Sequence, residues 1–181
     1  MVAVGEVTER TGRETVAPRV LGGGFAVLRI LFGAIWLSNG VAKAFFNQDN
    51  NFDWGFLSFH LINQPTAKSI LEGASDDTFQ PLRWIYRDFV LANWGFFQWF
   101  LTIAEIAAGL LLVFGIASRL GAAIGLALIG PIWVMLLDSN QYFWAYPVEL
   151  LPLLVLAVVP SGRTFGLDRE LAPRFGLRWP F

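Results

Sequence analysis

Residues 21–46 read LGGGFAVLRILFGAIWLSNGVAKAFF, and this stretch is almost continuously apolar. A spanning helix needs about 20 mostly apolar residues, because the hydrocarbon core is about 30 Å thick and each residue rises about 1.5 Å. The run is long enough to cross with tilt. A cleaved signal peptide, with Ala42-Lys43-Ala44 as a small-x-small site, is the competing interpretation, but its apolar region would be only about 7–15 residues long. The stretch therefore predicts a retained transmembrane helix.

The composition agrees with a membrane protein. Of the 181 residues, 55% are hydrophobic and only 15% are charged, so much of the chain should face lipid. The net charge of -1 and the scattered cations favour no nucleic-acid partner. The chain has no cysteine and its one histidine is His60, which excludes disulfides, iron–sulfur clusters and multi-histidine metal sites within it. We expect no metal and no intrinsic cofactor, so any redox work would need a ligand such as a quinone or another subunit.

Three further apolar runs complete the predicted fold. They cover residues 95–118, 120–137 and 143–159, and the last is the weakest because Pro147, Glu149 and Pro152 interrupt it. We therefore predict an all-α, polytopic membrane protein, a four-transmembrane-helix bundle over residues 21–160. Residues 1–20 and 161–181 are expected to be cytoplasmic tails.

Residues 47–94 form the largest polar excursion and are predicted to be an extended outer loop. Pro65 is suited to begin a short helix and Gly73 to end it. Residues 81–94 are amphipathic, and Trp84, Tyr86 and Trp94 suit the headgroup region, so this piece should lie along the membrane interface.

The distribution of lysine and arginine predicts the orientation. With the amino terminus inside, eight cations lie on the cytoplasmic side and three outside, which favours cytoplasmic N- and C-termini in the plasma membrane. The inner residues are Arg10, Arg13, Arg19, Arg119, Arg163, Arg169, Arg174 and Arg178, and the outer ones are Lys68, Arg83 and Arg87.

Two charges inside the spans point to a site. Arg29 lies about 12 Å from the inner start of its run and Glu105 about 15 Å from the outer start of its own, so both should lie near one level. An intramembrane charge costs about 2.5–3.5 kcal/mol and should have a partner, so we predict an Arg29–Glu105 pair. Stripes of polar and small residues at helical spacing indicate the facing surfaces. The predicted intramembrane polar site comprises Arg29, Trp36, Asn39, Gln98, Thr102 and Glu105.

Different roles remain open for these residues. The Arg29–Glu105 pair either fixes helix orientation or lines a cavity for a ligand or proton. Lys43, Asp138 and Glu149 reach similar depths and are predicted to form an outer-mouth cluster, unless they are ordinary interfacial side chains. Trp36 is alternatively a packing residue.

The charged residues and their surroundings resemble the DoxX/DoxD-like small membrane proteins. The first span is similar to that family's pattern at Arg29, Gly33, Gly40 and Lys43 within LRILFGAIWLSNGVAKAFF. The second, AEIAAGLLLVFGIASRLGA, is similar at Glu105, Gly109, Gly115 and Arg119. SGRTFGLD resembles the family's terminal turn at Gly162, Arg163, Gly166 and Asp168.

The resemblance implies a four-helix membrane bundle, and some relatives are the small subunit of a thiosulfate:quinone oxidoreductase. It therefore favours a quinone-linked redox subunit of a membrane oxidoreductase assembly. A non-enzymatic accessory subunit of a respiratory or envelope complex, docking through residues 47–94 or its helix faces, is the main alternative. A small-solute transporter is a weaker one, because the sequence shows no convincing inverted repeat.

Overall fold

The computed structural model describes residues 17–45, 51–53, 55–56, 58–76, 78–139, 142 and 144–181. Three of its helices are long and apolar enough to cross a membrane, namely α1 (Pro18–Phe45), α3 (Trp94–Phe114) and α4 (Ser118–Met135). A fourth helix, α5 (Ala145–Val158), is apolar but shorter. The structure therefore confirms the prediction of an α-helical membrane protein, with three helices suited to cross the bilayer. The proposed N-terminal tail lies outside the described residues up to residue 16, and Pro18, Arg19 and Val20 already belong to α1.

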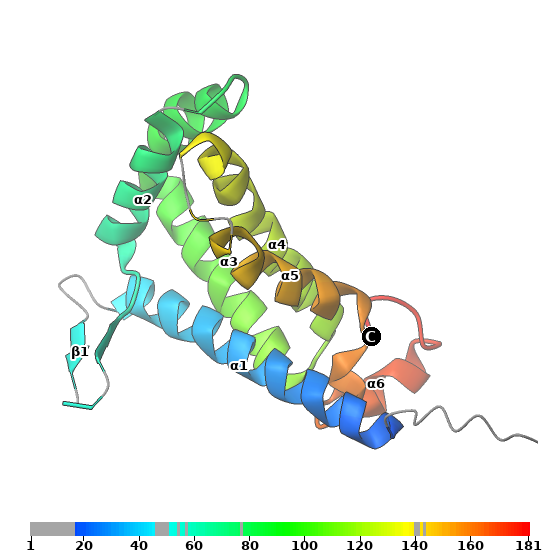
Figure 1. The fold of residues 1–181 in the computed structure, drawn as a ribbon. Coiled ribbons are helices and arrows are strands. Elements are labelled where there is room, and N and C mark those ends of the chain that lie inside the picture. The colour runs from blue at the N-terminus through cyan, green and yellow to red at the C-terminus, as the bar shows by residue number, and fades with distance from the viewer. Residues whose placement is uncertain are drawn as a thin grey trace, which may run out of the picture.

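The long helices pack in chain order around the bundle (Figure 1). Helix α1 packs mainly against α3, α3 against α4, and α4 against α5. A core cluster of Leu112, Ala122, Leu153 and Leu156 joins the last three, and Trp36 of α1 packs against it. On the opposite faces, side chains such as Val27, Leu31 and Ile103 are exposed, as expected for surfaces in lipid.

Glycines let α1 and α3 approach so closely that their backbones nearly touch. A Cβ atom at Gly33 would lie 2.7 Å from the Val113 nitrogen, and one at Gly109 would lie 2.5 Å from the Leu37 nitrogen. At Gly40 the added atom would meet Ile106 at 2.7 Å. Small residues at a helix crossing permit this approach in membranes, where close packing replaces the hydrophobic effect between helices. The predicted polar and small stripes thus do face each other.

The turn between α3 and α4 begins four residues earlier than predicted. Helix α3 ends at Phe114, because Gly115 takes the left-handed conformation at φ 62° and the Ile116 amide bonds back to the Leu111 carbonyl over 3.0 Å. Ala117 is also left-handed at φ 44°. Apolar residues continue past this point, so hydropathy alone could not locate the stop.

Residues between α1 and α3 form several short elements. Strands β1 (Asn51–Asp53) and β2 (Ser58–His60) pair antiparallel, which the all-α prediction missed. Helix α2 (Gln64–Asp76) confirms the predicted short helix but continues through Gly73. Its start is capped by Asn63, whose Oδ1 accepts the Thr66 amide over 2.9 Å.

A π-helix, η1 (Trp84–Leu91), then leads into α3. Tyr86 packs here against a core cluster formed by Leu71, Ala74, Val90 and Met135. Burial raises the pKa of the Tyr86 hydroxyl, so this group stays protonated at physiological pH. The amphipathic segment predicted over residues 81–94 is thus helical for most of its length.

The chain after α5 is folded rather than a loose tail. It contains η3 (Ser161–Arg163) and α6 (Asp168–Arg174), and η3 contacts both α1 and α4. The start of α1 and the segment after α5 thus lie at one end of the molecule, with α2 at the other (Figure 1). We call these the α6 end and the α2 end. A short helix η2 (Leu136–Asp138) closes α4 at the α2 end.

Candidate functional site

Buried charges lie at two separate levels of the bundle. Lys43 and Glu105 meet between α1 and α3 toward the α2 end, and Arg29 lies near Asp168 at the α6 end. We call the first group, together with Asn39, Gln98 and Thr102, the Lys–Glu site. The second group is the Arg–Asp junction, and the two have different partners and different surroundings.

The predicted Arg29–Glu105 pair is wrong. Glu105 binds Lys43, while Arg29 donates to the carbonyl oxygens of Leu112 and Phe165, each over 2.9 Å. Lys43 lies 14 positions beyond Arg29 on α1, or about 21 Å along the axis. The depth argument assumed that the two spans begin and end together, but the last turn of α1 lies beside the middle of α3.

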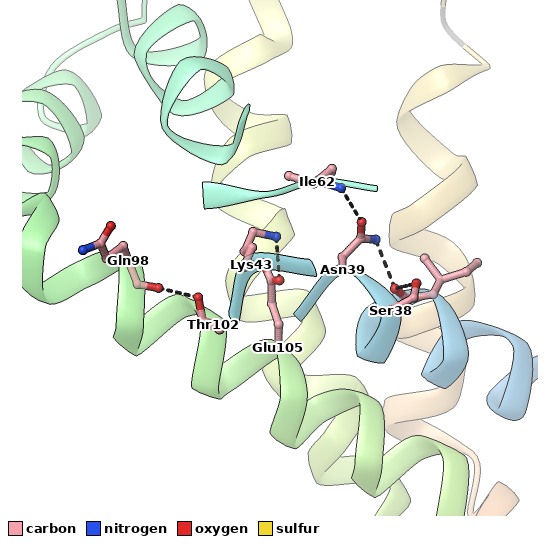
Figure 2. A network of polar contacts seen from close by, with 8 residues as sticks. Ser38, Asn39, Lys43, Ile62, Gln98, Thr102 and Glu105 are labelled. Atoms are coloured by element: carbon pink, nitrogen blue, oxygen red, sulfur yellow. Dashed lines mark hydrogen bonds and ion pairs between the residues drawn. The ribbon is translucent and has the colours of Figure 1, made fainter. Parts of the chain in front are cut away.

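The central contact of the Lys–Glu site is an ion pair between the two spans (Figure 2). The Lys43 Nζ atom lies 2.6 Å from Glu105 Oε2, and the side chains are only 5% and 14% exposed. Short distances of this kind are typical of charge-assisted hydrogen bonds. Pairing makes burial of the two charges tolerable, whereas either charge alone would be costly there. The pair therefore forms a polar point within an otherwise apolar helix interface.

A backbone segment crosses α1 next to this pair. The Ile62 amide donates to Asn39 Oδ1 over 2.8 Å, and Asn39 Nδ2 donates to the Ile35 carbonyl over 3.0 Å. Figure 2 shows the Ile62 segment passing over the end of α1 close to Lys43. Asn39 thus ties the chain after β2 to the helix that carries the lysine.

Replacing Asn39 with leucine should release this segment. The Ile62 amide would lose its acceptor, and one such hydrogen bond contributes about 1 kcal/mol net, so its hydrogen exchange should become about fivefold faster. Hydrogen exchange followed by mass spectrometry of peptides spanning residues 58–63 measures the change. Ser38→Ala is the matched control, because the Ser38 hydroxyl donates within its own helix, to the Ile35 carbonyl, and has no other hydrogen bond among the described residues. Equal exchange in both variants would contradict the role assigned to Asn39.

Two more predicted residues border the site from α3. Thr102 is almost fully buried and its hydroxyl donates to the Gln98 carbonyl over 2.6 Å, while the Gln98 amide makes a long contact of 3.4 Å to the Gly95 carbonyl. Figure 2 shows both on the helix that carries Glu105. Figure 2 thus shows Asn39, Lys43, Thr102 and Glu105 near the contact of α1 and α3, whereas the side-chain amide of Gln98 points away from Lys43.

Other predicted site residues lie elsewhere. Trp36 packs in the core, and a Cβ atom at Gly125 of α4 would lie 3.4 Å from its ring. Two members of the predicted outer-mouth cluster have other partners: Lys43 binds Glu105, and Glu149 accepts a hydrogen bond from Trp133 Nε1 over 3.0 Å. The side chain of Asp138 lies outside the described part of the structure. Trp36 is thus a packing residue, as the alternative interpretation had it, and Lys43 belongs to the Lys–Glu site instead of an outer mouth.

The Arg–Asp junction holds the segment after α5 against the other helices. Asp168 is fully buried and accepts the amides of Ala117 and Ser118 over 2.6 and 3.0 Å, at the start of α4. The Ser118 hydroxyl accepts the Gly162 amide over 3.1 Å. Arg29, also fully buried, interacts electrostatically with Asp168. The contacts connect α1, the start of α4, η3 and the start of α6.

Glycines provide the space for this junction. A Cβ atom at Gly115 would collide with the guanidinium of Arg29, and one at Gly162 would collide with the carboxylate of Asp168. A side chain at Gly166 would meet the Gly162 carbonyl. Sequence reasoning grouped Asp168 with these glycines through the family resemblance but gave Arg29 to another partner. Gly115, at the end of α3, is the sequence feature that could have indicated this contact, because the absence of a side chain there leaves space for the Arg29 guanidinium.

No further ligand set is evident. Among the residues that the structure describes, no three histidine, aspartate or glutamate side chains gather as metal ligands would. Comparison of the chain with protein-family models, curated proteins and solved structures finds no match. The resemblance to the DoxX/DoxD-like proteins therefore stays a prediction.

Proposed function

We propose that the chain is a DoxX-like membrane subunit of a quinone-linked redox assembly, in which the Lys–Glu site binds the quinone headgroup and carries its protons. The observation that supports this most directly is the Lys43–Glu105 pair, buried at 2.6 Å between two membrane-spanning helices. Ionisable side chains within spans commonly mark substrate or proton pathways, because keeping them in the membrane is costly.

The donors at the site fit a quinone headgroup, whose two carbonyl oxygens accept hydrogen bonds. Lys43 has three N–H groups, of which Glu105 takes one. Reduction to the quinol consumes two electrons and two protons. Lys43 would give one proton to an oxygen as charge develops there, and a proton arriving through Glu105 would restore the lysine so that it could give the second proton to the other oxygen. The electrons would come from a reduced donor of the thiosulfate class through another subunit, since this chain has no cysteine.

We also infer that α5 is the fourth span. Its 14 residues measure about 21 Å, short for the hydrocarbon core, but it is apolar and packs along α4 toward the α6 end. Four passes put both termini on one side, in agreement with the position of η3 beside α1. The arginines of the α6 end make that side cytoplasmic in the plasma membrane.

The Lys43→Met/Glu105→Leu double variant separates function from folding. Either single change leaves a buried charge unpaired and should destabilise the bundle, whereas removing both charges keeps the volume and restores stability. We expect the double variant to bind decylubiquinone at least about tenfold more weakly, because it loses charge-assisted hydrogen bonds. Equilibrium binding in detergent and co-purified quinone measure this, with unfolding in the same detergent as the check on the fold.

Arg83→Gln is the matched control. Arg83 is exposed and directly precedes η1, so the change removes a charge outside the Lys–Glu site. Wild-type protein that binds no quinone would sink the proposal. A folded double variant with unchanged quinone binding would also contradict the proposal, because it would show that the Lys43–Glu105 pair only fixes the orientation of the two helices.

A non-enzymatic accessory subunit is the second candidate. It is favoured by apolar surface on the described residues, including an open groove of about 490 Å³ between α1 and α5. Large aromatic side chains are also exposed around η1 and the start of α3, at Trp84, Phe89, Phe96, Trp99 and Phe100. Crosslinking in native membranes should then recover a stoichiometric partner through these residues, and a monomeric protein in the membrane would count against it.

A further inference from the structure

The segment that follows α5 exposes large apolar side chains although it is folded. Its exposed fractions are 80% for Phe165, 47% for Leu167 and 56–58% for the three residues after α6. Those three are Phe175, Leu177 and Trp179. Several large apolar side chains exposed within one short segment are a feature of contact surfaces.

Internal contacts hold these side chains in place. Arg163 Nη2 donates to the Leu177 and Phe181 carbonyl oxygens over 3.1 and 2.9 Å, and the rings of Phe175 and Phe181 stack at 4.6 Å. Asp168 fastens the start of α6 to the bundle. The apolar groups therefore remain outside because the fold keeps them there.

Exposed arginines alternate with these apolar residues. Arg169, Arg174 and Arg178 are exposed, whereas Glu170 is the one exposed acid among residues 163–181. Cations interleaved with aromatic and aliphatic side chains are typical of segments that lie in the interface of an anionic membrane. The charge thus favours a negatively charged surface as the partner.

The position of the segment agrees with that partner. A Cβ atom at Gly22, in the second turn of α1, would lie 2.7 Å from the Thr164 hydroxyl, and the Leu167 amide donates to the carbonyl of Phe114, where α3 ends. The segment therefore lies level with the ends of two spans, at the depth where lipid headgroups begin. Figure 1 shows α6 beside the first turns of α1.

We propose that residues 163–181 form an interfacial anchor that binds the anionic phospholipid surface of the bilayer in which the bundle sits. The apolar side chains enter the headgroup region, and Arg169, Arg174 and Arg178 bind lipid phosphates. The Arg–Asp junction connects this anchor rigidly to α1, α3 and α4. The charge of the bilayer surface would then affect the segment after α5, which also connects the helices of the bundle.

The test uses the full chain in nanodiscs containing phosphatidylcholine with or without phosphatidylglycerol. Native mass spectrometry of the released protein measures the preference for the anionic lipid. Each arginine near an anionic surface contributes about a fivefold preference, so the R169Q/R174Q/R178Q variant should lose about a hundredfold of the preference. The matched variant K68Q/R83Q/R87Q removes three cations from the α2 end and should keep it.

A single fluorescent probe locates the contact. The chain has no cysteine, so Leu177→Cys can be labelled with an environment-sensitive dye without background. Its emission should shift to shorter wavelength when phosphatidylglycerol is present, while a label at Ser69→Cys on α2 should not respond. Equal lipid preference in the two triple variants, no preference in the wild type, or loss of the shift on adding inorganic phosphate would overturn the proposal.

Discussion

Gly109→Ala is expected to lower the free energy of unfolding by about 3 kcal/mol, at the upper end of the usual cost of overpacking. The added Cβ atom would lie 2.5 Å from the Leu37 nitrogen and 2.7 Å from its Cα. Backbone atoms cannot move aside as a flexible side chain can, so α1 and α3 would have to separate along their whole contact. Separation would also weaken the neighbouring contacts at Gly33 and Gly40. Unfolding in mixed micelles, followed by circular dichroism, measures the loss.

Gly130→Ala is the matched control, since it makes the same change in another membrane helix. No atom within 4 Å would meet the new Cβ there, and alanine favours a helix over glycine by about 0.5–1 kcal/mol. The control should therefore be neutral or slightly stabilising. Similar losses in the two variants would show that α1 and α3 do not cross as described.

Asp168→Ala is expected to lower the free energy of unfolding by about 2–6 kcal/mol, because two buried amides lose their acceptor and each unsatisfied group costs about 1–3 kcal/mol. The substitution strands the charge of Arg29 and leaves the amides of Ala117 and Ser118 without an acceptor at the start of α4. A carboxylate at that end also complements the helix dipole. Asp168→Asn should cost less, because its amide oxygen still accepts one hydrogen bond.

A second set of variants checks the pairing itself. Asp88→Ala removes an exposed acid of η1 and should change stability by no more than about 0.5 kcal/mol. Arg29→Met combined with Asp168→Asn should cost less than the sum of the two single changes, since each single variant leaves the other group uncompensated. Strict additivity in the unfolding measurements would refute the coupling between Arg29 and Asp168.

The sequence predicts the parts of this fold that depend on local patterns. Hydropathy located three long helices to within a few residues, and helical spacing identified which faces of α1 and α3 meet. Thr102 and Gln98 were predicted at the site because they share the α3 stripe with Glu105, whereas Asn39 was placed there by its depth along α1. Such patterns repeat along one helix and do not require knowledge of its neighbours.

The relative shift of two helices is not a local property. Hydropathy predicts that both helices cross the same hydrocarbon layer. It does not predict that α1 is 28 residues long and ends beside the middle of α3. An error of this kind exchanged Arg29 for Lys43 as the partner of Glu105. The contact of Arg29 with the Phe165 carbonyl joins positions 136 residues apart, and only tertiary packing determines it.

The Arg–Asp junction has a consequence for biosynthesis. Arg29 lies on α1, whereas Phe165 and Asp168 come after α5 and are therefore synthesised later. During insertion the guanidinium must therefore remain near headgroups or water until α5 has been made and its following segment has folded back. Closure of the bundle is consequently a late event in translation. A chain interrupted before Phe165 would lack one carbonyl partner of Arg29 and the carboxylate of Asp168, and would keep a costly charge on α1.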